Sequence, residues 1–225
     1  KLMELAQDKG TPLAGRVAAI FTLKQLNGTK AQDDLLKLAA NSEVAEFALR
    51  ALTDRKSELK GLKKDVFASA LDTKKPRLRA QALVSLGRLG DPSAAAAILS
   101  HAAAPKLEKQ PAHNEANPAA VLSHLATRAL VALKPIDTLL DALDGTHGAT
   151  ALSVLKYMHD DQVVTTLSAR AAKNPDLATL NTLVRLYHRE GEYAQGWWGT
   201  RPDTSGPYFA REKWSGSDKI EAGLK

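Results

Sequence analysis

The chain of 225 residues is 44% hydrophobic and 25% charged, which excludes a disordered polypeptide and leaves enough apolar residues for a sizeable core. Its net charge of +6 favours an acidic partner only if the excess basic residues gather on one face. There is no cysteine, which excludes disulfides, thiolate metal sites and a cysteine nucleophile, and no apolar run approaches the roughly 18 residues of a membrane span.

Aromatic residues make up only 5% of the chain, whereas Ala and Leu are over-used, so we expect helices rather than sheets. The chain begins at Lys1, inside an expected helix and without an initiator Met, which fits a fragment of a longer protein. Within these residues the absence of cysteine also excludes a C-x-x-C-H haem attachment.

A short pattern, here called the repeat motif, recurs along the chain: a small residue, a large aliphatic residue, two variable positions and then Leu. Its six copies start at Ala19, Ala48, Ala82, Ala129, Ala151 and Thr182. Positions i, i+1 and i+4 share one helical stripe, so each copy predicts a helix, and Leu26, Leu89 and Met158 are expected to extend the stripe by a turn.

Further helical patterns lie between these copies and make each unit a helix pair. They cover residues 32–40, 59–71, 92–103, 136–143 and 161–172. Successive copies of the repeat motif are 22 to 47 residues apart, about the length of an antiparallel helix hairpin. Turn residues such as Gly90-Asp91-Pro92 fall between the patterns, with Gly suited to helix C-caps and Pro to first helical positions.

One copy resembles a known family closely. Residues 76–99 (PRLRAQALVSLGRLGDPSAAAAIL) are similar to a HEAT repeat, whose second helix carries an Arg, the apolar stripe and a Gly-Asp-Pro exit. The resemblance covers residues 1–190 and implies an all-α fold, a right-handed α-α superhelix (HEAT-like solenoid) of about five to six helix pairs. It also implies a scaffold that contacts protein or nucleic acid.

Basic residues are concentrated from Arg50 to Arg88, where eleven Lys and Arg stand against four Asp and Glu. This basic region predicts a contact with an acidic partner. The candidate contact residues are Lys63, Lys64, Lys74, Lys75, Arg77 and Arg79. The alternative is a set of solvated helix faces, because no aromatic residues are interleaved for stacking on bases.

A loop is expected at about residues 104–118, where Pro105, Pro111 and Pro118 prevent a continuous helix. At its tip, His113, Asn114 and Glu115 allow a metal or ligand role, against a simple solvated insertion.

The composition changes after Glu190, and residues 191–225 hold all three Trp. Gly and Pro exclude regular helix there, yet so many large rings require burial, so we expect an irregular aromatic cap on the last helix pair. A further helix is expected to start at Ser217 or Asp218. The alternative is a binding site formed by Trp197, Trp198, Arg201, Asp203 and Tyr208.

The tail sequence WWGTRPDTSGPYF, from Trp197 to Phe209 and followed by Trp214, carries a second resemblance. It is similar to the segment after the HEAT repeats in large exported or periplasmic proteins of planctomycete-type bacteria, which join a propeller-like dehydrogenase domain to a c-type cytochrome domain. The resemblance implies that this chain is the connecting module, that haem belongs to another part of the parent protein, and that the chain itself holds no cofactor.

No catalytic motif is present: the six His form no close ligand pair, and G-x-S-x-G, Walker A and G-x-G-x-x-G sequences are missing. The sequence therefore predicts a non-catalytic scaffold or spacer for protein or interdomain contacts. Its alternative is a nucleic-acid-binding protein, such as a helical-repeat DNA glycosylase, which the clustering of most of the aromatics in the tail disfavours.

Overall fold

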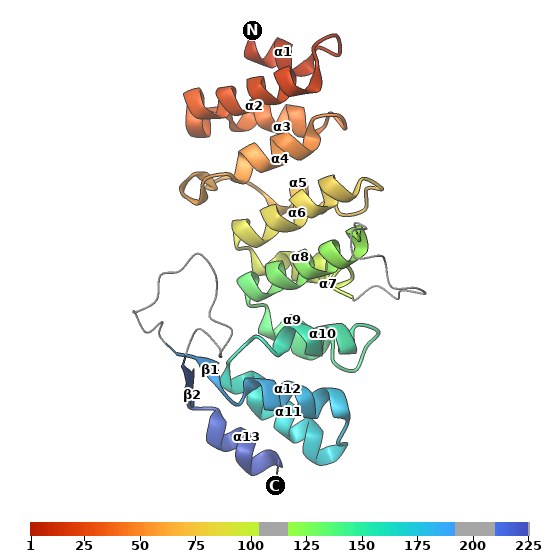
Figure 1. The fold of residues 1–225 in the computed structure, drawn as a ribbon, viewed down its shortest axis with the longest axis vertical. Coiled ribbons are helices and arrows are strands. Elements are labelled where there is room, and N and C mark those ends of the chain that lie inside the picture. The colour runs from red at the N-terminus through yellow and green to blue at the C-terminus, as the bar shows by residue number, and fades with distance from the viewer. Residues whose placement is uncertain (104–116, 192–209, 225) are drawn as a thin grey trace. The chain divides into compact units, whose positions relative to one another are not determined.

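A computed structural model describes residues 1–103, 117–191 and 210–224, and within them the fold is an all-α array of helix pairs with one short two-stranded ribbon (Figure 1). The chain divides into two compact units, Lys1–Pro135 (unit 1) and Ile136–Lys225 (unit 2). No helix in the described ranges is long and apolar enough to cross a membrane. The predicted all-α class and the repeated helix pairs are confirmed.

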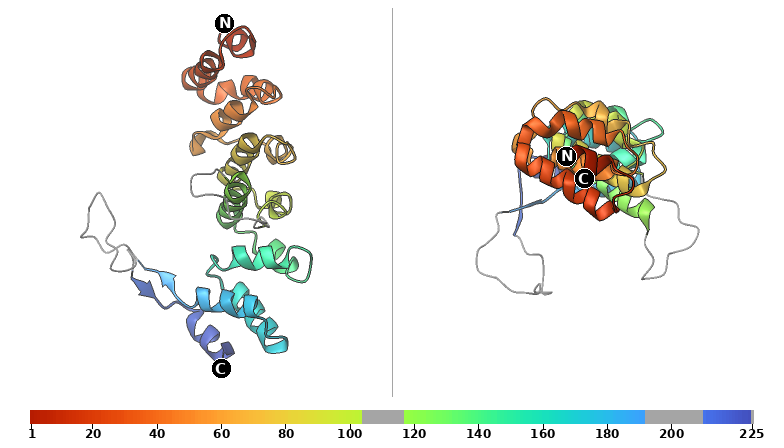
Figure 2. Two further views of the ribbon diagram at one scale, coloured as in Figure 1. Left: turned by 45° about the vertical axis from the view of Figure 1, so that its right-hand side comes forward. Right: turned by 90° about the horizontal axis from the view of Figure 1, so that it is seen from above.

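Unit 1 consists of four consecutive helix pairs. The pairs are α1 (Leu2–Gln7) with α2 (Leu13–Asn27), α3 (Gln32–Ala39) with α4 (Ala45–Thr53), α5 (Lys64–Ala68) with α6 (Pro76–Leu89), and α7 (Ala95–Leu99) with α8 (Pro118–Leu133). Short 3-10 helices lie at Gly28–Ala31, Lys56–Glu58 and Pro92–Ala94. The second helices stack in chain order, α2 on α4, α4 on α6 and α6 on α8 (Figure 2).

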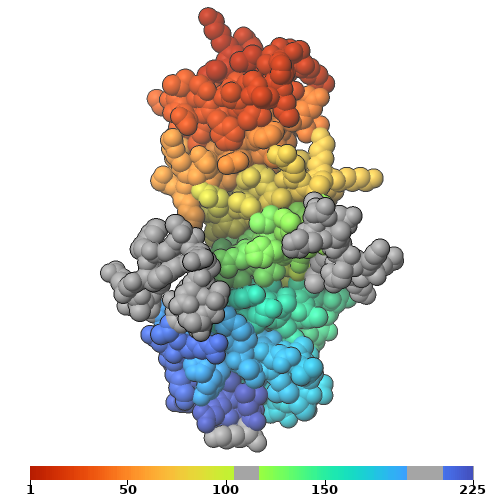
Figure 3. Space-filling model, in the orientation of Figure 1, coloured from red at the N-terminus to blue at the C-terminus, as the bar shows by residue number. Residues whose placement is uncertain are grey.

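Unit 2 continues with two pairs and a terminal helix. The pairs are α9 (Ile136–Asp141) with α10 (Gly148–Leu155) and α11 (Asp161–Lys173) with α12 (Leu177–Leu186). Strands β1 (Arg189–Glu190) and β2 (Arg211–Glu212) then pair antiparallel, and α13 (Ser217–Leu224) follows. In Figure 3 the dark-blue residues of α13 lie against the lighter blue of the last pair, in agreement with contacts of α13 to both α11 and α12.

The repeat motif accounts for this stacking. Its six copies lie on α2, α4, α6, α8, α10 and α12, the second helix of every pair, and every small, aliphatic and Leu position of the motif is buried. The small residues let the second helices approach closely. At Gly87 of α6, for example, a Cβ would stand only 3.0 Å from the Cα of Ala129 on α8.

The turn after α6 has the structure that its sequence predicts. Gly90 adopts a left-handed conformation (φ +76°) and caps α6, a conformation that costs a residue without Cβ little. Asp91 then accepts a hydrogen bond from the Ser93 N–H, and Pro92 occupies the first position of the following 3-10 helix.

Two expectations about helix extent and one about burial are wrong. The pattern at 59–71 yields only Lys64–Ala68, because Gly61, at φ +89°, interrupts the chain before it, and the pattern at 92–103 yields only Ala95–Leu99. Leu26 does not extend the buried stripe of α2, since it is 73% exposed and Lys24 is the buried residue there instead. The loop tip with His113, Asn114 and Glu115 lies outside the described residues.

A single Cβ added at Gly148 should disrupt the turn between α9 and α10. That atom would stand 2.3 Å from the backbone oxygen of Leu143, which cannot move aside as a side chain would. Gly148→Ala is therefore expected to lower the free energy of unfolding by about 2 kcal/mol, measured by urea denaturation. Gly145→Ala, whose Cβ would meet its nearest neighbour at an ordinary 3.6 Å, should leave stability nearly unchanged, and equal effects of the two changes would contradict the explanation.

Candidate functional site

The basic region mostly connects consecutive helix pairs of unit 1. The Lys64 ammonium donates to the Ser93 hydroxyl at 2.6 Å and the Ser93 carbonyl at 3.1 Å, and Lys75 donates to the Ser42 carbonyl at 2.7 Å. Arg77, in the first turn of α6, binds Glu46 in the first turn of α4 at 2.7 Å. Each side chain joins its own pair to the next or the previous one.

Arg79 and Arg88 also have partners. Arg79 donates to Nδ1 of His101 at 2.9 Å, and burial together with the nearby Arg79 charge lowers the pKa of His101, which keeps the ring neutral and able to accept. Arg88 donates to the Thr53 carbonyl at 2.6 Å and the Asp54 carbonyl at 2.5 Å, at the C-terminal end of α4. These carbonyls have no partner within the helix, so Arg88 satisfies them.

Lys63 and Lys74 differ from these bridging residues in their contacts. Both side chains are exposed, and neither makes a hydrogen bond or ion pair within the ranges that the structure describes. Of the six candidate contact residues of the basic region, these two are the ones with unengaged charges.

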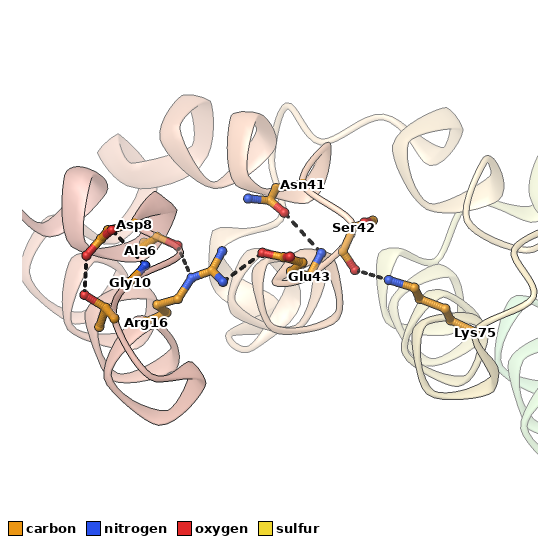
Figure 4. A network of polar contacts seen from close by, with 9 residues as sticks. Ala6, Asp8, Gly10, Arg16, Asn41, Ser42, Glu43 and Lys75 are labelled. Atoms are coloured by element: carbon orange, nitrogen blue, oxygen red, sulfur yellow. Dashed lines mark hydrogen bonds and ion pairs between the residues drawn. The ribbon is translucent and has the colours of Figure 1, made fainter.

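The same kind of bridge occurs at the first junction of unit 1, where the sequence analysis did not predict it. Arg16 of α2 is only 5% exposed, and it donates to the Ala6 carbonyl at 3.0 Å and to Glu43 at 2.9 Å (Figure 4). Figure 4 also shows Lys75 reaching the Ser42 carbonyl beside Glu43, so three consecutive pairs are connected through one loop. The ion pair with Arg16 lowers the pKa of Glu43.

A buried ion pair closes the other end of this junction. The Lys24 ammonium, on a side chain that is 1% exposed, lies 2.7 Å from Oε2 of Glu58, whose other oxygen accepts from Arg55 at 3.0 Å. Lys24 and then Arg55 hold the pKa of Glu58 below its ordinary value of 4.5. The position of Lys24, four residues after Ile20 on the apolar stripe, was the signal in the sequence for this buried ion pair.

Unit 2 has an equivalent bridge at Arg170 of α11. Its guanidinium donates to Asp144, which follows α9, and lies 3.7 Å from Asp176 before α12. Basic side chains thus join helix pairs in both units, beside contacts that involve no basic side chain, such as Thr53 with Ser85 and Gln162 with Asp137.

The tail candidates Trp197, Trp198, Arg201, Asp203 and Tyr208 lie outside the described residues. The flanking ribbon pairs Arg189 with Glu212 and Glu190 with Arg211. A helix does begin at Ser217.

Trp214 is the tail aromatic whose packing the structure describes. Its Nε1 donates to the Leu186 carbonyl at 2.8 Å, and its ring meets the ring of His159 edge to face at 5.4 Å between centroids. The Ser217 hydroxyl donates to the Tyr187 carbonyl at 2.6 Å, and Nε2 of His159 contacts the His188 carbonyl at 2.9 Å, which makes that nitrogen the donor. Three carbonyls at the end of α12 are thereby satisfied by side chains.

The described residues contain no group of three or more His, Asp and Glu that could hold a metal ion. Open hollows occur in both units. One of about 300 Å³ lies between α4 and α6 and is lined by Arg50, Thr53, Asp54, Gln81, Val84 and Arg88. Of its two arginines, Arg88 is engaged with carbonyls, and the Arg50 guanidinium lies 5.8 Å from the Phe21 ring centroid.

No protein-family model matches the chain, and no curated protein matches it. Among solved structures, the complex of CpcE and CpcF of phycocyanin lyase from Nostoc sp. PCC7120 is similar at 17% identity, over 83% of this chain and 74% of that chain, with a TM-score of 0.47. The repeat architecture described above therefore rests on the helix pairs themselves and not on this likeness.

Replacing Glu58 and replacing Lys24 should have unequal effects on the melting temperature. Glu58→Gln leaves the ammonium of Lys24 buried without its carboxylate and is expected to lower the melting temperature by roughly 5–10 °C. Lys24→Met fills the same apolar space and leaves Glu58 with Arg55, so the melting temperature should change little.

The pH dependence provides a second readout of this pair. Because the folded pKa of Glu58 is lowered, its contribution to stability is complete above the unfolded value near 4.5 and is lost as the pH falls through the folded value. Urea midpoints measured from pH 7 to pH 3 should fall less steeply for Glu58→Gln than for the unmodified chain. Parallel curves would contradict the assigned pairing.

Trp214 should contribute both packing and a hydrogen bond to the docking of the tail. Trp214→Ala is expected to lower the free energy of unfolding by about 3 kcal/mol, as deletion of a large packed ring does. Trp214→Phe keeps a ring against His159 but loses the donor to Leu186, and about 1 kcal/mol should be lost. An unchanged denaturation curve for Trp214→Ala would refute the docking of this residue.

Proposed function

We propose that this chain is a non-catalytic HEAT-like scaffold or spacer that holds protein or interdomain contacts. The observation that supports this is the series of basic bridges between helix pairs at Arg16, Lys24, Arg77, Arg88 and Arg170. Side chains that could serve a reaction or a ligand are instead used to fix neighbouring pairs to each other. Within each unit, bridges of this kind keep neighbouring helix pairs at a constant spacing.

The parent protein, in this proposal, is a larger exported redox protein with a dehydrogenase domain and a c-type cytochrome domain. The support is the resemblance of the tail sequence from Trp197 to Trp214 to the segment that follows HEAT repeats in such proteins. The haem belongs to another domain, this chain holds no cofactor of its own, and its location is periplasmic or otherwise exported.

Sequencing the reading frame on both sides of the chain tests this parentage. A leader before it and a C-x-x-C-H motif after it are expected. If neither is found, the redox parent is wrong. A gel shift with duplex DNA in low salt then tests the nucleic-acid alternative: a salt-sensitive shift would replace the proposed protein contacts, and the absence of a shift would retain them.

The acidic partner proposed for the basic region depends on its unengaged charges. The double change Lys63→Glu with Lys74→Glu should weaken binding of poly-L-glutamate, used as an acidic probe in 20 mM NaCl, by about tenfold without changing the melting temperature. The matched change Lys64→Glu with Lys75→Glu should lower the melting temperature, because these lysines hold Ser93 and Ser42.

Lys30→Glu on the exposed 3-10 helix of unit 1 makes half of that change in net charge and controls for the non-specific effect of one charge reversal. If the double variant at Lys63 and Lys74 binds the probe as well as the unmodified chain does, that face is merely solvated.

A further inference from the structure

A basic hollow in unit 2, here called the basic groove, is not used by the contacts described so far. It has a volume of about 380 Å³ and is lined by Asn181, Val184, Arg185, His188, Arg189, Glu190 and Arg211. These residues come from α12, from the chain just after it and from the β1–β2 ribbon. Three guanidinium groups and one carboxylate line the groove, so an anion is favoured there.

The arginines of the groove are largely unengaged, unlike the bridging residues between helix pairs. Arg211 makes no side-chain hydrogen bond or ion pair to any residue that the structure describes, and Arg189 has one long ion pair of 3.7 Å to Glu212. The Arg185 guanidinium lies 6.0 Å from the Tyr157 ring centroid, which leaves its N–H groups available. A planar guanidinium with unused donors is suited to bidentate binding of a carboxylate.

The end of α12 does not compete for these arginines. The carbonyls at a helix C-terminus normally attract cations and repel anions. Here those of Leu186, Tyr187 and His188 are satisfied from Trp214, Ser217 and His159. These three carbonyls therefore do not require the guanidinium groups of the groove as donors.

An aliphatic surface adjoins the charge. Val184, in the groove, is 60% exposed, and Leu177, seven residues earlier and so on the same face of α12, is 75% exposed. Among the described residues that line the groove, the only ring is the imidazole of His188, and Tyr157, which is 44% exposed, lies beside the groove with its ring contacted by the cations of Lys156 and Arg185. A protein segment fits this combination better than a nucleic acid does.

We infer that the basic groove binds an acidic segment of a partner protein, in which a carboxylate engages Arg185 and Arg211 and an aliphatic side chain covers Val184. The inference rests on the proposed scaffold function, but it concerns a different surface, in a different unit, from Lys63 and Lys74. An experiment can therefore disprove the binding at the basic groove without disproving the contact at Lys63 and Lys74, and the reverse.

The test measures binding of a fluorescein-labelled peptide of alternating Glu and Leu by fluorescence polarisation, in 20 and 150 mM NaCl. Arg185→Glu and Arg211→Glu should each weaken binding at least about tenfold. Arg185→Gln and Arg211→Gln should weaken it less and serve if the reversed variants fold poorly. Val184→Ser should weaken binding of this peptide, but not of one with Ala in place of Leu.

Lys30→Glu, the same change of charge on unit 1, and the double variant at Lys63 and Lys74 should bind the peptide as the unmodified chain does. No measurable binding in 20 mM NaCl, or equal losses for Lys30→Glu and Arg185→Glu, would overturn the inference. So would tighter binding of a single-stranded oligonucleotide of equal charge that Arg185→Glu abolishes. If the unmodified chain does not bind the peptide and Arg185→Glu lowers the melting temperature, the partner of Arg185 lies within the chain. That result would also overturn the inference.

Discussion

Burial of the repeat motif between the consecutive second helices of each unit is the interaction on which the fold depends. A single helix pair covers one apolar face internally and leaves another in water, so neighbouring pairs must cover it. Each buried Leu of the motif contributes about 1.5–3 kcal/mol relative to exposure. Small residues make the contact close: Ala129 of α8 lies where Gly87 of α6 leaves no Cβ in the way.

Apolar contact of this kind sets the distance between helices, but it does not define which turn faces which. The polar bridges do. Arg77 matches the first turn of α6 to the first turn of α4 through Glu46, and Arg88 matches the far end of α6 to the last carbonyls of α4. A shift by one turn would leave these groups without partners, some of them buried, which is costly even though a buried pair itself adds little stability. We therefore interpret the bridges as determinants of register.

How much of the fold the sequence predicts depends on how far apart along the chain the interacting residues lie. The repeat motif lies within one helix, so it correctly placed the second helix of every pair, and the local chemistry of Gly90-Asp91-Pro92 predicted its own turn. Leu26 and Lys24 are both near the margin of the stripe, and which of the two is buried depends on Glu58, more than 30 residues away. Local composition could not show this.

The basic region illustrates the same limit for the candidate site. Its excess charge was visible, but charge counting along the chain does not reveal that Lys64, Lys75 and Arg77 have partners about 30 residues away on neighbouring pairs. The basic groove was missed because Arg185 and Arg211 are separated by 25 intervening residues and share a surface only through the β1–β2 ribbon.

The capping of α12 connects the tail to the groove. At the end of α4 a basic side chain satisfies the carbonyls, and the N–H donors of Arg88 are thereby used within the fold. At α12 the donors are instead the indole of Trp214, the hydroxyl of Ser217 and the imidazole of His159. Uncharged indole and hydroxyl donors satisfy carbonyls as well as an arginine does. Because these donors satisfy the carbonyls of α12, Arg185 and Arg211 keep their N–H groups available for a partner.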